Sequence, residues 1–137
     1  MEAEILKFAA SIGATEPDKT SEIYTSFRQI FKRHNYFVCN GNLLIIKISR
    51  SKKPFWGVGK EYIDFLNVLN NYYLVLLTCS SEGWVFNKNE INNFIGTKRW
   101  NLRYEDNNYK INFPLPDKNS FITKKKFFQI TGIQESS

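Results

Sequence analysis

The stretch YFVCNGNLLIIKIS, residues 36–49, decides the fold. An Asn-Gly pair between two apolar runs is the strongest short-range signal for a β-hairpin. We therefore expect Tyr36–Cys39 and Leu43–Ile48 to pair as antiparallel strands. The second run is apolar up to Lys47, which is typical of a buried strand.

A helix and a second apolar strand follow this hairpin. The segment KEYIDFLNVLNN, residues 60–71, repeats apolar residues at helical spacing. The next segment, YYLVLLTC, is apolar on both faces, so we expect it at the centre of a covered sheet. Strand, helix and strand in this order predict a right-handed crossover that makes Leu43–Ile48 and Tyr72–Cys79 parallel.

The remaining elements complete one α/β (α+β) domain over residues 1–137. Further helices are expected within 2–15, 21–34 and 87–96, a short strand at 84–86, and a second hairpin within 100–113 that turns at Glu105–Asn108. The expected architecture is a single-layer mixed sheet with helices on both faces. We divide the chain into an N-terminal helix and loop (1–19), a core (20–113) and a basic C-terminal tail (114–137).

The charge distribution favours an anionic partner. The formal net charge is +6, and the span from Ile23 to Lys60 contains no Asp or Glu. The cations of that span are Arg28, Lys32, Arg33, Lys47, Arg50, Lys52, Lys53 and Lys60.

The cysteines and the N-terminus indicate a reduced, cytoplasmic protein. Cys39 and Cys79 with the single His34 do not make up a structural zinc site within one chain. The first residues carry Glu2 and Glu4 where a signal peptide has positive charge, and the longest apolar run is strand-sized. We therefore expect no membrane partner.

The stretch ISRSKKPFWGVGK, residues 48–60, is predicted to be a loop at the carboxyl end of a central strand, where such folds place ligands. Its cations suit phosphates and its rings suit unstacked bases. The predicted nucleic-acid-binding residues are Arg50, Lys52, Lys53, Phe55, Trp56 and Lys60, with Lys98 and Arg99 as a second basic patch.

A structural interpretation competes with this one. Phe55 and Trp56 would fill the core, and the lysines would form a solvated rim. Lys98 and Arg99 would then serve as dipole caps at a helix end. A phosphate-binding loop at GVGK is excluded, because the motif requires a glycine where Pro54 stands and a hydroxyl residue where Glu61 stands.

The order of helix, hairpin, strand ending in IIKIS, basic loop, helix and apolar strand resembles the core of the PD-(D/E)xK nuclease superfamily, over roughly Ser21 to Phe94. The resemblance implies a restriction-endonuclease-like core, with two acids that bind magnesium and a lysine that orients the attacking water. Lys47 matches that lysine, and Glu22 could match the auxiliary acid of the family.

The metal-binding acids of that pattern do not stand at the matching positions. Ile45 occupies the place of one acid, and the other would fall near Asn40 or Asn42. The resemblance therefore implies a nucleic-acid groove without a metal and without a cofactor. The alternative is an active nuclease that uses Mg²⁺ with other acids, such as Glu61, Asp64 or Glu82.

Three functions follow from these observations. The first is a small protein that binds DNA or RNA through the Arg50–Lys60 loop. The second is the metal-dependent nuclease, in which Glu22 and Lys47 are the catalytic candidates. The third is an interaction or inhibitor module that docks an acidic protein, since carboxylates attract the same cations as phosphates.

Overall fold

A five-stranded sheet forms the centre of the computed structural model, which describes residues 3–18, 20, 22, 25, 36–69 and 71–135. Its strands are β1 (Tyr36–Cys39), β2 (Asn42–Ile48), β4 (Tyr72–Leu77), β5 (Gly83–Asn87) and β8 (Ser120–Phe121), in the spatial order β1-β2-β4-β5-β8. The predicted hairpin is confirmed: β1 and β2 are antiparallel, and both turn residues, Asn40 and Gly41, have positive φ.

The predicted parallel pair is also confirmed. Helix α3 (Lys60–Leu66) lies between β2 and β4 in the chain, and these strands pair in parallel from Leu43↔Tyr72 to Ile48↔Leu77. β4 is therefore a central strand with hydrogen-bonded neighbours on both sides. Most of its side chains are buried, as its continuous apolar sequence predicts.

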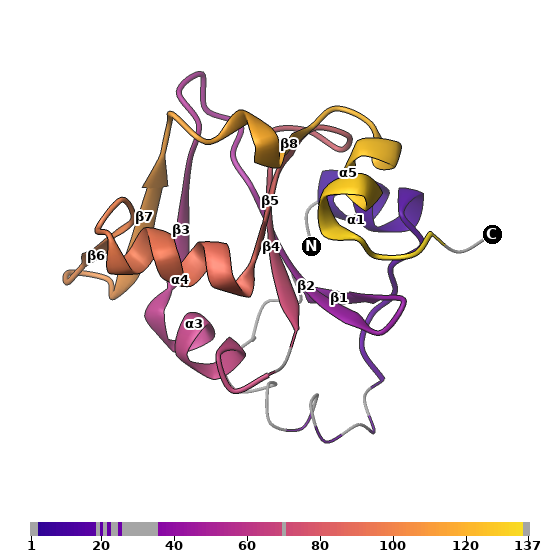
Figure 1. Cartoon of the computed structure of the whole chain (residues 1–137), viewed down its shortest axis with the longest axis horizontal. Coiled ribbons are helices and arrows are strands. Elements are labelled where there is room, and N and C mark those ends of the chain that lie inside the picture. The colour runs from indigo at the N-terminus through magenta and orange to yellow at the C-terminus, as the bar shows by residue number, and fades with distance from the viewer. Residues whose placement is uncertain are drawn as a thin grey trace.

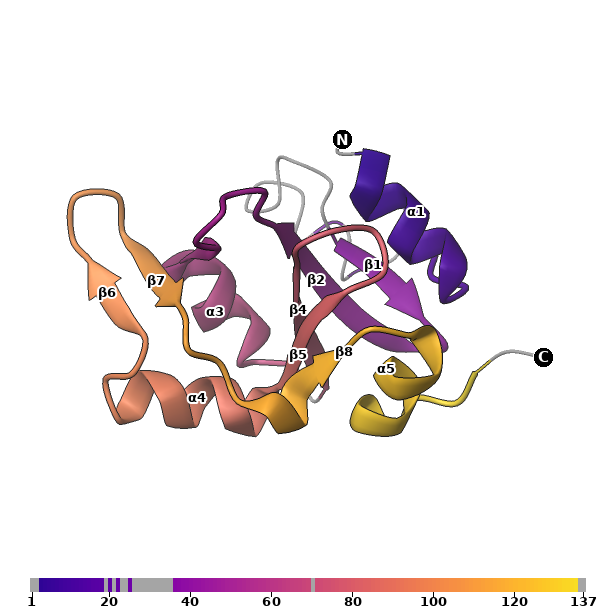
Figure 2. The same ribbon diagram turned by 90° about the horizontal axis from the view of Figure 1, so that it is seen from above.

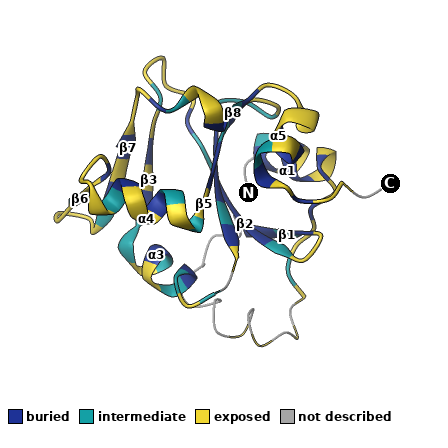
Figure 3. Cartoon of the chain, viewed as in Figure 1, coloured by how far each residue is buried: buried dark blue, intermediate teal, exposed yellow. Residues whose placement is uncertain are grey.

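Helices cover both faces of the large sheet, which confirms a mixed α+β fold. Helices α1 (Ala3–Ser11) and α5 (Lys124–Thr131) lie on one face, while α3 and α4 (Lys88–Gly96) lie on the other (Figures 1 and 2). Alternate residues of β2 supply the two cores. Leu44 and Ile46 pack with α1 and α5, and Leu43 and Ile45 pack with α3 and α4. Figure 3 shows the buried positions concentrated along the strands of this sheet.

A second sheet contains Phe55–Gly59, which is part of the loop that the sequence predicts at 48–60. It consists of β3 (Phe55–Gly59), β7 (Asn108–Asn112) and β6 (Asn101–Arg103), all antiparallel, in the order β3-β7-β6. The loop prediction was wrong for Phe55–Gly59 because two glycines conceal an alternating strand pattern. The predicted hairpin within 100–113 is confirmed as β6 and β7, and the described residues form two sheets where one layer was expected.

The last segment of the chain belongs to the core. Residues 114–137, expected as a basic tail, contain the 3₁₀ turn η1 (Asp117–Asn119), β8 and α5. Phe127 and Phe128 of α5 are buried against the large sheet, while the lysines before them remain exposed. Thr123 caps the start of α5, and Gly132 ends it with a φ of 72°. The prediction of a basic tail was wrong because the three lysines occupy the first turn of an amphipathic helix.

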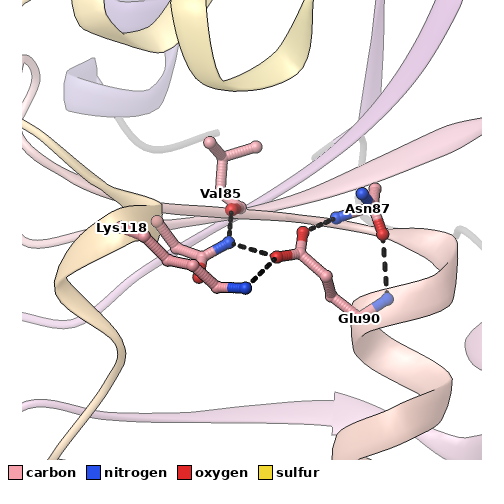
Figure 4. A network of polar contacts seen from close by, with 5 residues as sticks. Val85, Asn87, Glu90 and Lys118 are labelled. Carbon is pink, nitrogen blue, oxygen red and sulfur yellow. Dashed lines mark hydrogen bonds and ion pairs between the residues drawn. The ribbon is translucent and has the colours of Figure 1, made fainter.

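A polar network joins α4 to β5 and η1 (Figure 4). A capping box begins the helix that was predicted within 87–96: Asn87 Oδ1 accepts from the Glu90 amide at 2.8 Å, and Glu90 Oε1 accepts from the Asn87 amide at 3.0 Å. The buried Asn119 donates from Nδ2 to the Val85 carbonyl at 2.9 Å and to Glu90 Oε2 at 2.8 Å. The Glu90 carboxylate on α4 therefore connects this helix to the end of β5 and to η1.

Two predictions fall wholly or partly outside the described residues: the helix expected at 21–34, and the cations Arg28, Lys32 and Arg33 of the span without acids. In the helix expected at 21–34, Glu22 and Thr25 are described and are helical, and the others lie outside the described part of the chain. Among the described residues, no helix has both the length and the apolarity required to cross a membrane.

Candidate nucleic-acid interface

The connection between β2 and β3 carries three of the predicted cations. Arg50, Lys52 and Lys53 are all exposed, and Arg50 Nε forms an ion pair with Glu4 at 3.3 Å. The buried Ser49 accepts a hydrogen bond from the Phe55 amide at 3.2 Å, which fixes where β3 begins. In the sequence, Lys53 and Lys52 precede Phe55 by two and three residues.

Trp56 points into the protein, so the prediction that it stacks on a base is wrong. Its side chain is 2% exposed, and its indole Nε1 donates to the Leu77 carbonyl at 3.1 Å. The ring also packs edge-on against Trp84 at 5.7 Å between centroids. Successive residues of a strand face opposite ways, so burial of Trp56 directs Phe55 outward.

Phe55 is 52% exposed on the outer surface of β3. The structural interpretation, which placed Phe55 in the core, is therefore wrong for this residue and confirmed for Trp56. The Nζ atom of Lys110, on β7, lies 5.5 Å from the centroid of the Phe55 ring. This is a cation–π contact between two strands.

Lys60 begins α3 and has a partner for its charge. Its Nζ donates to Asp64 Oδ2 one turn along the helix. That hydrogen bond, with the negative charge of Asp64, raises the pKa of Lys60 above its ordinary value. Because a carboxylate already neutralises this ammonium group, we expect Lys60 to contribute less to phosphate binding than Lys52 or Lys53.

Lys47 lies at the end of β2, beside a small hollow. Its Nζ is 5.5 Å from the centroid of the Tyr62 ring on α3. The hollow has a volume of about 390 Å³, and its lining includes Lys47, Arg50, Phe55 and Gly57. The lining also includes Trp56, so the structure gathers four of the predicted residues around one depression.

The position that matches one acid of the nuclease pattern lies in the hydrophobic core. Ile45, at the position of one acid, is completely buried in the core. Glu22 is exposed. Among the described residues, no group of three or more His, Cys, Asp or Glu side chains lies where it could hold a metal ion.

Lys98 and Arg99 follow the end of α4, and both are exposed. The Arg99 guanidinium carbon lies 5.6 Å from the centroid of the Phe94 ring. Arg99 also borders a cavity of about 490 Å³ that is lined in addition by Asn101, Lys110 and Asn112. Lys98, with a φ of 61°, does not line this cavity.

Lys110 is the functional candidate that the sequence analysis missed. It contacts the Phe55 ring on one side and borders the same cavity as Arg99 on the other, so it joins the two basic patches. We call this set the basic strip: Lys52, Lys53, Phe55, Lys110 and Arg99. The alternation of buried Tyr109 and Ile111 does indicate that Lys110 faces outward, but only the pairing Gly57↔Lys110 places it beside Phe55.

Another cavity has the opposite charge. It measures about 740 Å³ and lies between the β1–β2 hairpin and the segment that follows α3. Among the described residues that line it, the charged ones are the acids Glu16 and Asp18. A polyanion would be repelled from this cavity, so it does not compete with the basic strip as a nucleic-acid site.

Comparison with protein-family models, curated proteins and solved structures finds no match for this chain. Function is therefore inferred from the chemistry of the basic strip.

Proposed function

We propose that this protein binds nucleic acid through the basic strip. The observation that carries the proposal is the exposed Phe55 ring, which has the Lys110 ammonium group over it and Lys52 and Lys53 next to it in the chain. A half-exposed ring offers a face to an unpaired base, and the ammonium groups offer partners to its phosphates.

The resemblance to the PD-(D/E)xK superfamily remains part of this proposal. The hairpin, the crossover helix α3 and the parallel strand β4 support it. The buried Ile45 and the absence of a carboxylate cluster among the described residues support a binding protein over a magnesium-dependent nuclease. The free thiols of Cys39 and Cys79 support a reducing, cytoplasmic location.

Fluorescence anisotropy across a salt series tests the proposal. The wild-type protein should bind labelled DNA or RNA with an affinity that falls steeply with salt, because each phosphate contact releases counterions. The double variant K52A/K53A should reduce the magnitude of the slope of log K against log salt by up to about 1.4 on a single strand or about 1.8 on a duplex.

The matched control is K125A/K126A, which removes the same charge from the exposed side of α5, on the opposite face of the large sheet (Figure 1). This control should leave the salt slope close to that of the wild type. Absence of binding to every nucleic acid at low salt would overturn the proposal, and so would an equal loss from the control pair.

Two further assays separate the alternative functions. Incubation of plasmid DNA with Mg²⁺ or Mn²⁺ should leave the plasmid intact, whereas cleavage would support the nuclease. Capture of an acidic protein that survives nuclease treatment, with no binding to nucleic acid, would support the interaction module in place of the proposal.

A further inference from the structure

We propose that the occupant of the basic strip is a single strand of nucleic acid, which lies across the outer face of the small sheet β3-β7-β6. This inference rests on the proposed function and specifies which nucleic acid is bound and where. The small sheet stands at the side of the molecule opposite α1 and α5 (Figures 1 and 2), and Phe55, Lys110 and Asn112 on its outer face are exposed.

Three rows of paired residues make up this outer face. One row is Phe55 with Asn112, the next is Gly57 with Lys110 and Asn101, and the third is Gly59 with Asn108 and Arg103. Rows on one face of a sheet are about 7 Å apart, and three strands span about 10 Å. The residues between them in sequence, Trp56, Val58, Tyr109 and Ile111, are buried beneath the sheet.

Polar groups dominate the face. Gly57 and Gly59 contribute no side chain, and the Asn108 side chain lies over both, since a Cβ atom would lie 3.6 Å from Asn108 Nδ2 at Gly57 and 3.4 Å from Asn108 Oδ1 at Gly59. Asn101 and Asn112 are exposed beside Lys110, and their amides both donate and accept hydrogen bonds, as the edges of unpaired bases require.

The negative charge at the β6–β7 turn disfavours binding of a duplex. A two-stranded ribbon can enter a major groove, but the turn between β6 and β7 carries Glu105 and Asp106. Both carboxylates lie near Arg103 Nε, at 3.6 and 3.8 Å, so the end of the hairpin is acidic and the charge of Arg103 is already paired. Phosphates would be repelled there.

The favoured path therefore runs across the strands at the Phe55 end of the sheet. It starts at Lys52 and Lys53, passes over Phe55 and Lys110, and ends at Arg99. A base stacks on the Phe55 ring, and Lys110 contacts the phosphate next to it. A continuous path of this kind suits a flexible single strand, whose bases are free to turn toward the protein.

The test uses the full chain and a labelled oligothymidylate of about 20 nucleotides, longer than the site sizes of about 4–16 nucleotides of small single-strand-binding modules. A duplex of equal length is the comparison. The single strand should bind more tightly than the duplex at the same salt concentration. F55A should weaken single-strand binding by about 5- to 150-fold, with little change in the salt slope. K110A should reduce the magnitude of that slope by about 0.7.

Y104A is the matched control, because Tyr104 is also an exposed ring, 86% accessible, but stands beside the acidic turn. Its binding should equal that of the wild type. Because Phe55 lies on the surface, F55A should retain the native circular dichroism spectrum and melting curve.

Three results would overturn the inference while leaving the proposed function in place. They are tighter binding to the duplex, single-strand binding that K52A/K53A weakens but F55A does not, and an equal loss from Y104A and F55A. Failure to bind any nucleic acid at low salt would instead overturn the proposed function itself.

Discussion

Replacing Glu90 with alanine should lower the free energy of unfolding by about 1.5–4 kcal/mol. The carboxylate accepts hydrogen bonds from Asn119 Nδ2 and from the Asn87 amide, and it lies 3.9 Å from Lys118 Nζ. The Asn119 amide has two N–H groups, and E90A leaves one of them without an acceptor while the other keeps its bond to the Val85 carbonyl. Asn119 is only 1% exposed, so water cannot easily replace the lost acceptor.

The magnitude is the sum of two contributions. A buried donor left without a partner costs about 1–3 kcal/mol. Loss of half of the capping box adds about 0.5–1 kcal/mol, because water replaces the carboxylate at the Asn87 amide. The Lys118 pair adds little, since the lysine side chain is 76% exposed. The total is a large fraction of the about 5–15 kcal/mol that stabilises a typical domain.

Urea denaturation followed by tryptophan fluorescence measures this loss. E90A should unfold at a lower urea midpoint with an unchanged m-value, which indicates an intact native state. K118A is the control, and it should change the free energy of unfolding by less than about 0.5 kcal/mol. A loss below about 1 kcal/mol in E90A, or an equal loss in K118A, would refute the reasoning.

Two further predictions concern buried titratable groups. Burial raises the pKa of the Cys39 thiol above its ordinary 9.0, so a thiol reagent at neutral pH should modify Cys79 first and Cys39 after denaturation; equal rates in the native protein would contradict this. Burial also raises the pKa of Tyr72 from 10.0 to about 12, so the folded state holds this proton at pH values where the unfolded chain releases it. Stability should therefore be lost as pH rises from about 10 to about 12, by up to about 2–3 kcal/mol, and urea titrations should show a smaller decline in Y72F than in the wild type.

The pairing of β1, β2 and β4 in the large sheet could be predicted because its signals are local. The Asn-Gly turn specifies one hairpin by itself, and the pattern of strand, helix and strand restricts the pairing of β2 with β4 to one direction. The capping box at Asn87 and Glu90 is likewise a pattern of four residues. Each of these features depends on side chains that are neighbours in the sequence.

The small sheet depends on partners that are distant in the chain. Phe55 pairs with Asn112, and nothing near Phe55 in the sequence indicates that partner. Two glycines and four cations around Phe55 are typical of a loop, and tertiary pairing overrode that preference. The error at the C-terminus has the same origin, since Lys124–Thr131 becomes a recognisable helix when Phe127 and Phe128 have a sheet to cover.

The candidate site could be predicted in part. Lys52, Lys53 and Phe55 are exposed, as binding residues must be, and composition alone indicated them. Whether Phe55 and Trp56 point outward or inward could not be assigned before the strand was known. Successive side chains point to opposite faces in a strand, but not in a loop. The role of Lys110 required the fold, whereas Lys60 and Asp64 form an i, i+4 pair within the helix predicted at 60–71.

The alternation of β3 constrains how this protein can change over evolutionary time. Outward positions such as Phe55 can accept new residues and retune recognition, since their side chains touch little of the interior. An insertion or deletion of one residue within the strand would exchange its two surfaces, bringing an indole into water and pushing a surface ring toward the core. Related chains should therefore differ there by replacement and preserve the length of the strand.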